Sequence, residues 1–341
     1  GVVMEKNWIK IASIYVGTVI GAGFASGREI IEFFGVYGLK GIVGIIISGF
    51  LFSVLGSLLL IKINNNRISD FNQLAALVFG RRLGFIIDTL IAFSLYTGFS
   101  VMVSGSGAIF MEELGISFNI GVLIMVICCF LVFLFSLEGL SFINTVLVPL
   151  LILGIVFTSL YLNIREGYNF SNVLGVNLTK KGNFLTSSIL YFGSNSLIVL
   201  VVFSSLLPMI DSRRTAILAG AVGGAILCIL GLSILTAMLI YYNEVCYLEI
   251  PMIKICSYIG ENYRKLYSVI LWIAMYTTAL ANGFGFMNRI AKERYKIPII
   301  ALFCIIAIPL AKVGFSNLIG IIYPIFGVIG FIMMVGVLVK S

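Results

Sequence analysis

Two short patches interrupt otherwise apolar stretches of this sequence, and their residue types could bind a charged solute. The first patch, residues 21–27, holds three glycines, and the charged Arg28 and Glu29 follow it directly. The second patch, residues 192–196, brings glycine, serine and asparagine into a strongly apolar run. Glycine inside a helix costs about 1 kcal/mol relative to alanine, so we predict a broken helix at both patches. Broken helices expose N–H groups that attract anions and carbonyl groups that attract cations.

The composition indicates which solvent surrounds these patches. Of the 341 residues, 60% are hydrophobic and 11% are charged, and the mean hydropathy is +1.15. A soluble domain carries about 25% charged residues, so we predict an all-α integral membrane protein whose partner is the lipid bilayer. The net charge of +8 comes from basic residues in short loops between apolar runs. That distribution is typical of membrane proteins and argues against a nucleic-acid partner.

A helix needs about 20 apolar residues to cross the hydrocarbon core of a bilayer, and on that scale the sequence predicts ten transmembrane helices. The two patches fall in the first and the sixth of these helices. We therefore expect a single transmembrane domain, 8–339, built as a 5+5 inverted repeat of about 8–163 and 183–339. The repeats are inverted because five crossings reverse the orientation of the second half. The ten predicted ranges are 8–35, 39–63, 83–111, 117–136, 140–163, 183–207, 214–242, 265–288, 297–312 and 317–339.

Close helix packing is the alternative explanation of the first patch. Gly17 and Gly21, and likewise Gly23 and Gly27, have the spacing that lets two helices approach closely. A second interruption at the corresponding position of the other half favours a solute site between two broken helices. Paired interruptions of this kind are typical of transporter binding sites.

Residues 19–24, Val-Ile-Gly-Ala-Gly-Phe, resemble the first-helix IGxGxF signature of the amino acid–polyamine–organocation transporter superfamily, which has the LeuT-type fold. The longer string 17–29 resembles the YkvI-type membrane proteins, a branch of that superfamily. The resemblance implies alternating access around a central site lined by helices one, three, six, eight and ten. We therefore expect a secondary active transporter of an amino acid or related small zwitterion, and not an enzyme. A proton-coupled or uncoupled carrier of another small organic solute, and a channel, are the alternatives.

The predicted substrate-binding residues lie at the two patches and in the third helix. Tyr96 is chosen by resemblance to a tyrosine at that level in LeuT-like carriers, and ordinary packing is its alternative. Phe192 is expected to cover a substrate side chain, and Asn195 and Ser196 to hydrogen-bond the substrate. Tyr323, which precedes a proline, is predicted to mark a plain kink rather than to face the cavity. The full set is Gly21, Ala22, Gly23, Phe24, Ala25, Ser26, Gly27, Tyr96, Tyr191, Phe192, Gly193, Asn195 and Ser196.

Three charged residues that follow the first patch, Arg28, Glu29 and Glu32, are predicted to form a gate. A cation at the bilayer centre costs at least about 2.5–3.5 kcal/mol, so Arg28 needs a partner or water. Arg28 either pairs with Glu32 four residues later or closes the outer side of the site, as the matching arginine does in LeuT-like proteins. Glu29 either binds a substrate amine or stabilises the gate.

Sodium is the expected coupling ion. The pattern of Ala274, two residues, and then Thr277 and Thr278 resembles the eighth-helix half of the sodium site in LeuT-like symporters. Gly17 and Ile20 match the carbonyls that the first helix supplies there. Hydroxyl and carbonyl oxygens together suit a hard cation. The alternatives are that the two threonines bond only to their own helix, or that protons drive transport, although the fifth predicted helix carries no acidic or basic residue.

The sequence also excludes several chemistries. It has no histidine, which excludes a histidine proton relay, a histidine-containing metal site and a Ser/His/Asp triad. Its six cysteines lack metal-ligand spacing, and no nucleotide-binding motif indicates a primary pump. We expect no cofactor other than bound Na+. Asp88 is expected to form a structural ion pair with Arg81 or Arg82, and residues 1–3, before Met4, to be a cloning remnant.

The loops predict a multi-pass cell-membrane protein with both termini in the cytoplasm. Of the 22 lysines and arginines, thirteen fall on the side of the termini and eight on the other side, and Arg28 lies inside a helix. Such residues are enriched on the cytoplasmic side. On a cysteine-free background, a cysteine at position 213 should escape an impermeant thiol reagent added to intact cells, and one at 180 should react. The reverse labelling pattern would invert the topology.

Overall fold

The computed structural model describes residues 7–135, 140–174, 182–290 and 296–340, which form helices joined by short connections. The expected remnant, residues 1–3, and Lys180 lie outside these ranges. The helices are α1 (Asn7–Val19), α2 (Ala22–Ser26), α3 (Arg28–Phe33), η2 (Gly35–Tyr37), α4 (Leu39–Asn65), α5 (Phe71–Leu114), α6 (Phe118–Phe135), α7 (Leu140–Glu166), α8 (Ser171–Leu174), α9 (Phe184–Ser204), η3 (Leu207–Met209), α10 (Arg213–Ile240), α11 (Tyr242–Val245), α12 (Pro251–Ser257), α13 (Glu261–Ile290), α14 (Lys296–Ala311) and α15 (Phe315–Val339).

Within the described ranges, seven helices are long and apolar enough to cross a membrane. They are α4, α5, α7, α9, α10, α13 and α15, and α6 and α14 are shorter apolar helices. Large apolar side chains point away from the protein on these helices, such as Phe50 and Leu153, each 65% exposed, and Ile332, 61% exposed. Lipid is the solvent that accepts such a surface. The protein is therefore an all-helical membrane protein.

The first predicted span is divided into three short helices. α1 ends at Val19, Gly21 is extended with φ −101° and ψ −175°, and α2 begins at Ala22. Gly27 then separates α2 from α3 with φ +79°. This left-handed conformation favours glycine, and a Cβ there would lie only 1.8 Å from the terminal methyl of Met238. The glycines of the first patch therefore let the backbone leave the helical path twice.

The sixth predicted span is not interrupted, so the predicted second break is wrong. α9 continues as helix through residues 192–196. Ser194 Oγ donates to the carbonyl of Tyr191 at 2.8 Å, and bonding of this kind satisfies polar side chains without unwinding the backbone. Gly193 serves close packing instead, because a Cβ on it would lie 1.9 Å from the carbonyl oxygen of Gly327 in α15.

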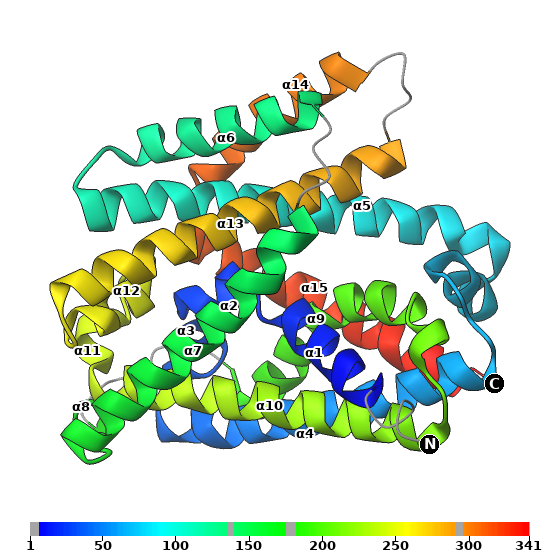
Figure 1. The fold of residues 1–341 in the computed structure, drawn as a ribbon, viewed down its shortest axis with the longest axis horizontal. Helices are drawn as coiled ribbons and strands as arrows, with labels where there is room; N and C mark the ends of the chain where they lie inside the picture. The colour runs from blue at the N-terminus through cyan, green and yellow to red at the C-terminus, as the bar shows by residue number, and fades with distance from the viewer. Residues whose placement is uncertain (1–6, 136–139, 175–181, 291–295, 341) are drawn as a thin grey trace.

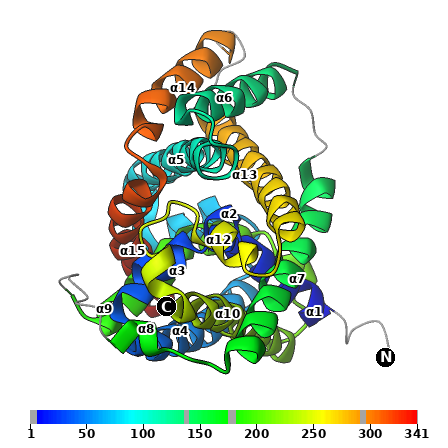
Figure 2. The ribbon, with the colours of Figure 1, turned by 90° about the vertical axis from the view of Figure 1, so that its left-hand side faces the viewer.

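The helices surround a short central pair. Figure 2 shows α2 and α3 near the centre, with α5 and α13 on one side of them and α4 and α10 on the other. α4 and α10 lie side by side (Figure 1). A Cβ on Gly220 would lie 2.4 Å from the backbone N of Ser57, and one on Gly224 would lie 2.3 Å from that of Ser53. Small residues permit this close approach, which holds helices together in lipid, where burial of apolar surface gives little driving force.

The helix ends gather at two opposite ends of the molecule. The start of α1 and the end of α15 lie at one end, and α11 and α12 lie at the other (Figure 1). At the first end, the Asn7 amide donates to Asp211, just before α10, at 2.6 Å. We refer to this end as the termini end. Residues 242–257, which contain α11 and α12, are the cap, and the end that they cover is the cap end.

Two glycines provide a matched test of the α9–α15 contact. Gly193→Ala should lower the melting temperature by several degrees, because overpacking costs about 1–3 kcal/mol. Gly21→Ala should leave it unchanged, since no atom lies within 4 Å of its Cβ position. The measurement is thermal unfolding of the purified variants in detergent. Equal melting temperatures for the two variants would show that α9 and α15 do not approach closely at Gly193.

Candidate functional site

A cavity of about 190 Å³ lies at the break between α1 and α2. The first span, α5, α9, α13 and α15 line it, which are the spans that the resemblance to LeuT-type transporters implies. Its wall mixes apolar side chains with a few polar groups, as is usual for small-molecule sites. The residues are Thr18, Val19, Gly21, Ala22, Gly23, Glu29, Ser94, Leu95, Thr97, Gly98, Met102, Ser194, Asn195, Leu197, Ile198, Thr278, Asn282, Ile322, Tyr323 and Phe326.

Glu29 brings a carboxyl group to the cavity wall. The residue is 5% exposed, and its side chain shares a hydrogen bond with Tyr323 of α15. Gly23 makes room for this carboxyl group, because a Cβ at position 23 would lie 2.0 Å from Glu29 Oε1. The glycine patch therefore positions an acidic side chain as well as breaking the helix.

The cavity continues toward the termini end as a second hollow of about 400 Å³. The two hollows share four wall residues, Ser94, Leu95, Leu197 and Ile198. The second hollow also reaches Arg289, near the end of α13. A solute can therefore approach the broken helix from the termini end.

Asp88 forms an ion pair with Arg289 at this mouth. Its Oδ1 lies 2.8 Å from Nη1 of Arg289, so the pair joins α5 to α13. The expected partners, Arg81 and Arg82, have side chains outside the described part of the structure, so that pairing stays a prediction.

Arg28 helps to close the cap end. Its Nη1 donates to the carbonyls of Cys246 and Leu248 in the cap, at 2.8 and 3.1 Å, and its Nη2 lies 3.1 Å from Glu32. The Arg28 and Glu32 side chains are 11% and 14% exposed. One guanidinium group therefore makes both the ion pair with Glu32 and the hydrogen bonds to the cap.

Two further carboxyl groups hold the cap in place. Glu112, at the end of α5, accepts hydrogen bonds from the backbone N–H groups of Glu249 and Ile250 at 2.7 and 3.1 Å. The Glu249 carboxylate accepts in turn from the backbone N–H and the hydroxyl of Ser316 at 2.6 and 3.1 Å. Charge-assisted hydrogen bonds therefore link α5, the cap and α15.

Some sequence-predicted residues face the cavity and others lie around it. The carbonyl of Ala25 accepts a hydrogen bond from the Tyr267 hydroxyl at 2.7 Å, and Ser26 Oγ donates to the carbonyl of Gly23 at 2.6 Å. Tyr96 packs against aromatic rings of α13 and α14, outside the cavity wall. The predicted residues that line the cavity are Gly21, Ala22, Gly23, Glu29, Asn195 and Thr278.

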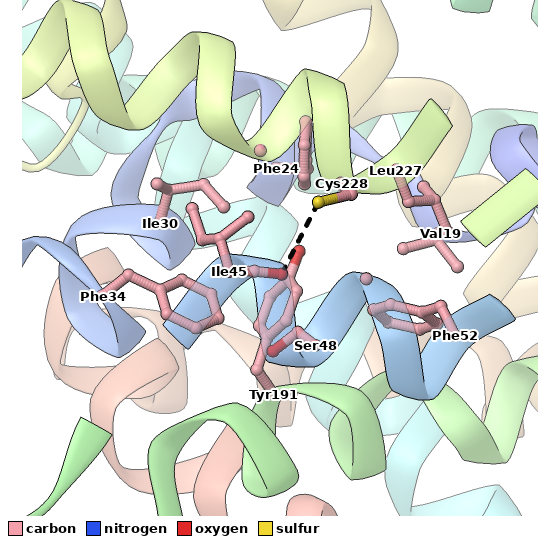
Figure 3. A pocket seen from close by; sticks show the side chains of 12 residues that line it. Val19, Phe24, Ile30, Phe34, Ile45, Ser48, Phe52, Tyr191, Leu227 and Cys228 are labelled. Carbon is pink, nitrogen blue, oxygen red and sulfur yellow. Dashed lines mark hydrogen bonds between the residues drawn. The ribbon is translucent and has the colours of Figure 1, made fainter. Parts of the chain in front are cut away.

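The predicted aromatic residues Phe24 and Tyr191 line a separate pocket of about 10 Å³, shown in Figure 3. The Tyr191 ring centroid lies 5.0 Å from that of Phe34 and 6.1 Å from that of Phe52. Phe192 also packs on Phe52, with centroids 5.0 Å apart. A pocket of this size holds about one water molecule. In this conformation these side chains therefore pack the protein and do not cover a solute.

The residues expected to bind sodium differ in the hydrogen bonds that their oxygen atoms already make. Thr277 and Thr278 donate to the carbonyl of Ala274 at 3.1 and 2.8 Å, which is the bonding to their own helix that the sequence left open. A hydroxyl that donates still has oxygen lone pairs to offer. Within the described residues, no backbone N–H donates to the carbonyls of Gly17 and Ile20, because the helix ends between them.

Sequence reasoning missed several polar residues of the wall. Ser94 and Thr97 of α5 and Asn282 of α13 line the cavity. Each of these three residues is a polar residue inside an apolar span, and that feature of the sequence could have identified them. Tyr323 was expected to mark a plain kink, but it faces the cavity, and α15 stays one helix through the proline that follows.

Opening of the cap can be followed through Cys256 of α12. The thiol is buried, and burial raises the pKa of the Cys256 thiol to about 12, so little reactive thiolate exists near pH 8. Arg28→Ala removes the hydrogen bonds that Arg28 donates to the cap. It should increase N-ethylmaleimide labelling of Cys256 several-fold, as measured by mass spectrometry. Buried Cys304 of α14 is the internal control, because its labelling would indicate unfolding. Unchanged labelling of Cys256 would contradict a closing role for Arg28.

Comparison with solved structures finds the same fold in several transporters. No family model matches the chain. The structure of a manganese transporter from Eremococcus coleocola matches with a TM-score of 0.66 at 17% identity, over 99% of this chain and 80% of that chain. A Na+-coupled sialic acid symporter matches with a TM-score of 0.53 at 12% identity, over 100% of this chain and 88% of that chain. At such low identities the likeness shows the fold alone.

The sequence itself has a relative of almost the same length. The uncharacterized membrane protein YkvI of Bacillus subtilis (strain 168) is 30% identical over 340 residues, which cover 97% of this chain and 95% of that protein. This agrees with the resemblance of residues 17–29 to YkvI-type proteins. The chain belongs to the family of YkvI-like membrane proteins, and its fold is that of LeuT-like transporters.

Proposed function

We propose that the protein is a secondary active transporter that moves a small solute by alternating access. One observation carries the proposal: the cavity at the broken first span is open toward the termini end and covered at the cap end. A channel needs a path that is open to both sides at once, whereas a carrier exposes its site to one side at a time. The fold, which is that of solved transporters, supports the carrier.

The proposed membrane arrangement has ten spans in one domain, 8–339, with inverted repeats of about 8–163 and 183–339. Successive helices that link the termini end to the cap end support it. Both termini are assigned to the cytoplasm of a cell-membrane protein, on the basis of the loop charges. The structure then corresponds to an inward-open state. Since α9 is continuous, one interrupted span supports this arrangement in place of a matched pair.

The proposed substrate is an amino acid or a related small zwitterion. A cavity of about 190 Å³ is of a suitable size, and it has both apolar and polar walls. Gly21, Ala22 and Gly23 supply backbone groups at the break, and Asn195 supplies an amide. Arg28 and Glu32 act as the gate at the cap end.

Sodium is the proposed coupling ion, held by carbonyls of Gly17, Ile20 and Ala274 and by the hydroxyls of Thr277 and Thr278. The support is the carbonyls that the end of α1 leaves without a backbone donor and the position of Thr278 in the cavity wall. Proton coupling is the second candidate. The buried carboxyl group of Glu29 beside the cavity favours it, because such a group can exchange a proton with the solvent of the hollow.

The test is uptake of radiolabelled amino acids into proteoliposomes under an inward sodium gradient. A membrane potential of 100 mV adds about 2.3 kcal/mol of driving force for each sodium ion that enters. Thr277→Ala/Thr278→Ala should raise the sodium concentration for half-maximal uptake roughly tenfold, because two ligands are lost. Ser233→Ala is the matched control, since its hydroxyl bonds to its own helix in α10 at 2.8 Å.

Two outcomes would remove the sodium assignment and keep the carrier. One is full uptake with choline in place of sodium, and the other is a double variant with unchanged sodium dependence. Uptake driven by a proton gradient alone would favour the second candidate. Uptake that does not saturate with solute concentration would contradict a carrier.

A further inference from the structure

We propose that Glu29 binds an organic ammonium group in the cavity, and that the transported solute is therefore an amine recognised by its positive charge rather than by a carboxylate. This inference rests on the proposed transport function and narrows its substrate class. It arises from the position of one acidic side chain that no other group in the described structure neutralises.

The Glu29 carboxylate has unused capacity to accept hydrogen bonds. A carboxylate offers about four lone-pair positions, and the donor that contacts this one is the hydroxyl of Tyr323. Among the described residues, no lysine or arginine lies within 4.0 Å of it, whereas Arg28 is engaged with Glu32 and the cap. Burying a carboxylate without a cation is costly, and the ammonium group of a bound amine would supply the missing positive charge.

Local backbone geometry separates Glu29 from the gate. Successive residues on a helix point about 100° apart, so Arg28 reaches the cap while Glu29 turns to the cavity. Gly27, with φ +79°, directly precedes α3 and turns the chain between α2 and α3. Gly23 leaves the space that the Glu29 carboxyl group fills. The glutamate is therefore part of the cavity wall and not of the gate ion pair.

The surroundings fit an organic ammonium group better than a metal ion. Ca²⁺ takes six to eight oxygen ligands, but Glu29 has one oxygen neighbour from another side chain, that of Tyr323. The cavity of about 190 Å³ is much larger than a bare ion. Its apolar wall residues, including Met102, Ile322 and Phe326, suit the carbon skeleton of a solute.

The same wall gives a solute carboxylate no charged partner. Among the described residues that line the cavity, Glu29 is the one acid, and none is a lysine or an arginine. Hydroxyl and amide groups, such as those of Ser94, Asn195 and Asn282, can donate hydrogen bonds, but they carry no charge. An ammonium group therefore gains more from this cavity than a carboxylate does, and an amine that lacks a carboxylate should bind as well as the amino acid.

The experiment compares matched trios of solutes by thermal shift and by isothermal titration calorimetry on the purified protein. Each trio holds an amino acid, the amine that remains after removal of its carboxylate, and the acid that remains after removal of its amine. Leucine, isopentylamine and 4-methylpentanoate form one trio; phenylalanine, phenethylamine and 3-phenylpropanoate form a second; alanine, ethylamine and propionate form a third. In at least one trio the amine should stabilise the wild-type protein, and the acid should not.

Variants then locate the binding group. Glu29→Gln keeps the size of the side chain and should raise the dissociation constant of the amine at least about tenfold. Glu261→Gln is the control, because it removes an equivalent charge from a 66% exposed side chain in an ion pair with Arg264. Tyr323→Phe should weaken binding less than Glu29→Gln, since the carboxylate itself remains.

The outcomes are distinct. Binding of an acid in preference to its matched amine, equal binding by Glu29→Gln, or no response to any amine would overturn the inference. The comparison of amine with acid uses the wild-type protein, so it stands even if a variant fails to fold. Failure of the transport function would appear differently, as an amine that binds through Glu29 but shows no saturable uptake into proteoliposomes.

Discussion

The broken backbone of the first span is the constraint on which the rest of the structure depends. A helix that stops at Val19 and restarts at Ala22 inside a bilayer leaves N–H and C=O groups without partners, and lipid cannot supply any. α5, α9, α13 and α15 enclose this point and keep it from lipid. The hollow toward the termini end lets water or a solute reach the free groups. The break in the first span can therefore exist in a bilayer because the cavity keeps its free backbone groups away from lipid.

Different interactions hold the long helices together and hold the cap in place. Along their lengths, α4 with α10 and α9 with α15 approach through glycines so closely that a Cβ would overlap the neighbouring backbone. Contacts of this kind are rigid, because they leave no room for rearrangement. The cap is held instead by hydrogen bonds from Arg28 and to Glu112 and Glu249. The cap therefore depends on polar contacts, whereas the long helices depend on close packing of small residues.

One short helix carries both the arginine that contacts the cap and the acidic group of the cavity. Arg28 and Glu29 are neighbours on α3, yet the guanidinium group holds the cap and the carboxyl group faces the hollow. Any movement of α3 therefore displaces both groups together. Tyr323 adds a link from Glu29 to α15, and Glu32 abuts α15 near Gly320, where a Cβ would lie 3.0 Å from its Oε1. The cap contact and the cavity wall are therefore joined through α3 and α15.

The sequence by itself determined the membrane environment, the helical class and the break in the first span, because hydropathy and glycine content act locally. It also placed Glu29 and Asn195 among the residues of interest. It was wrong about a break in the sixth span, since Ser194 can bond to its own helix and only the approach of α15 shows that Gly193 serves packing. The ion pair of Asp88 with Arg289 follows from the packing of α13 on α5, which no local pattern shows. Only the tertiary structure decided that Arg28 meets the cap, that Tyr323 meets Glu29 and that Tyr191 lies outside the cavity. Those contacts join residues far apart in the chain, and their geometry depends on how the helices pack rather than on any local pattern.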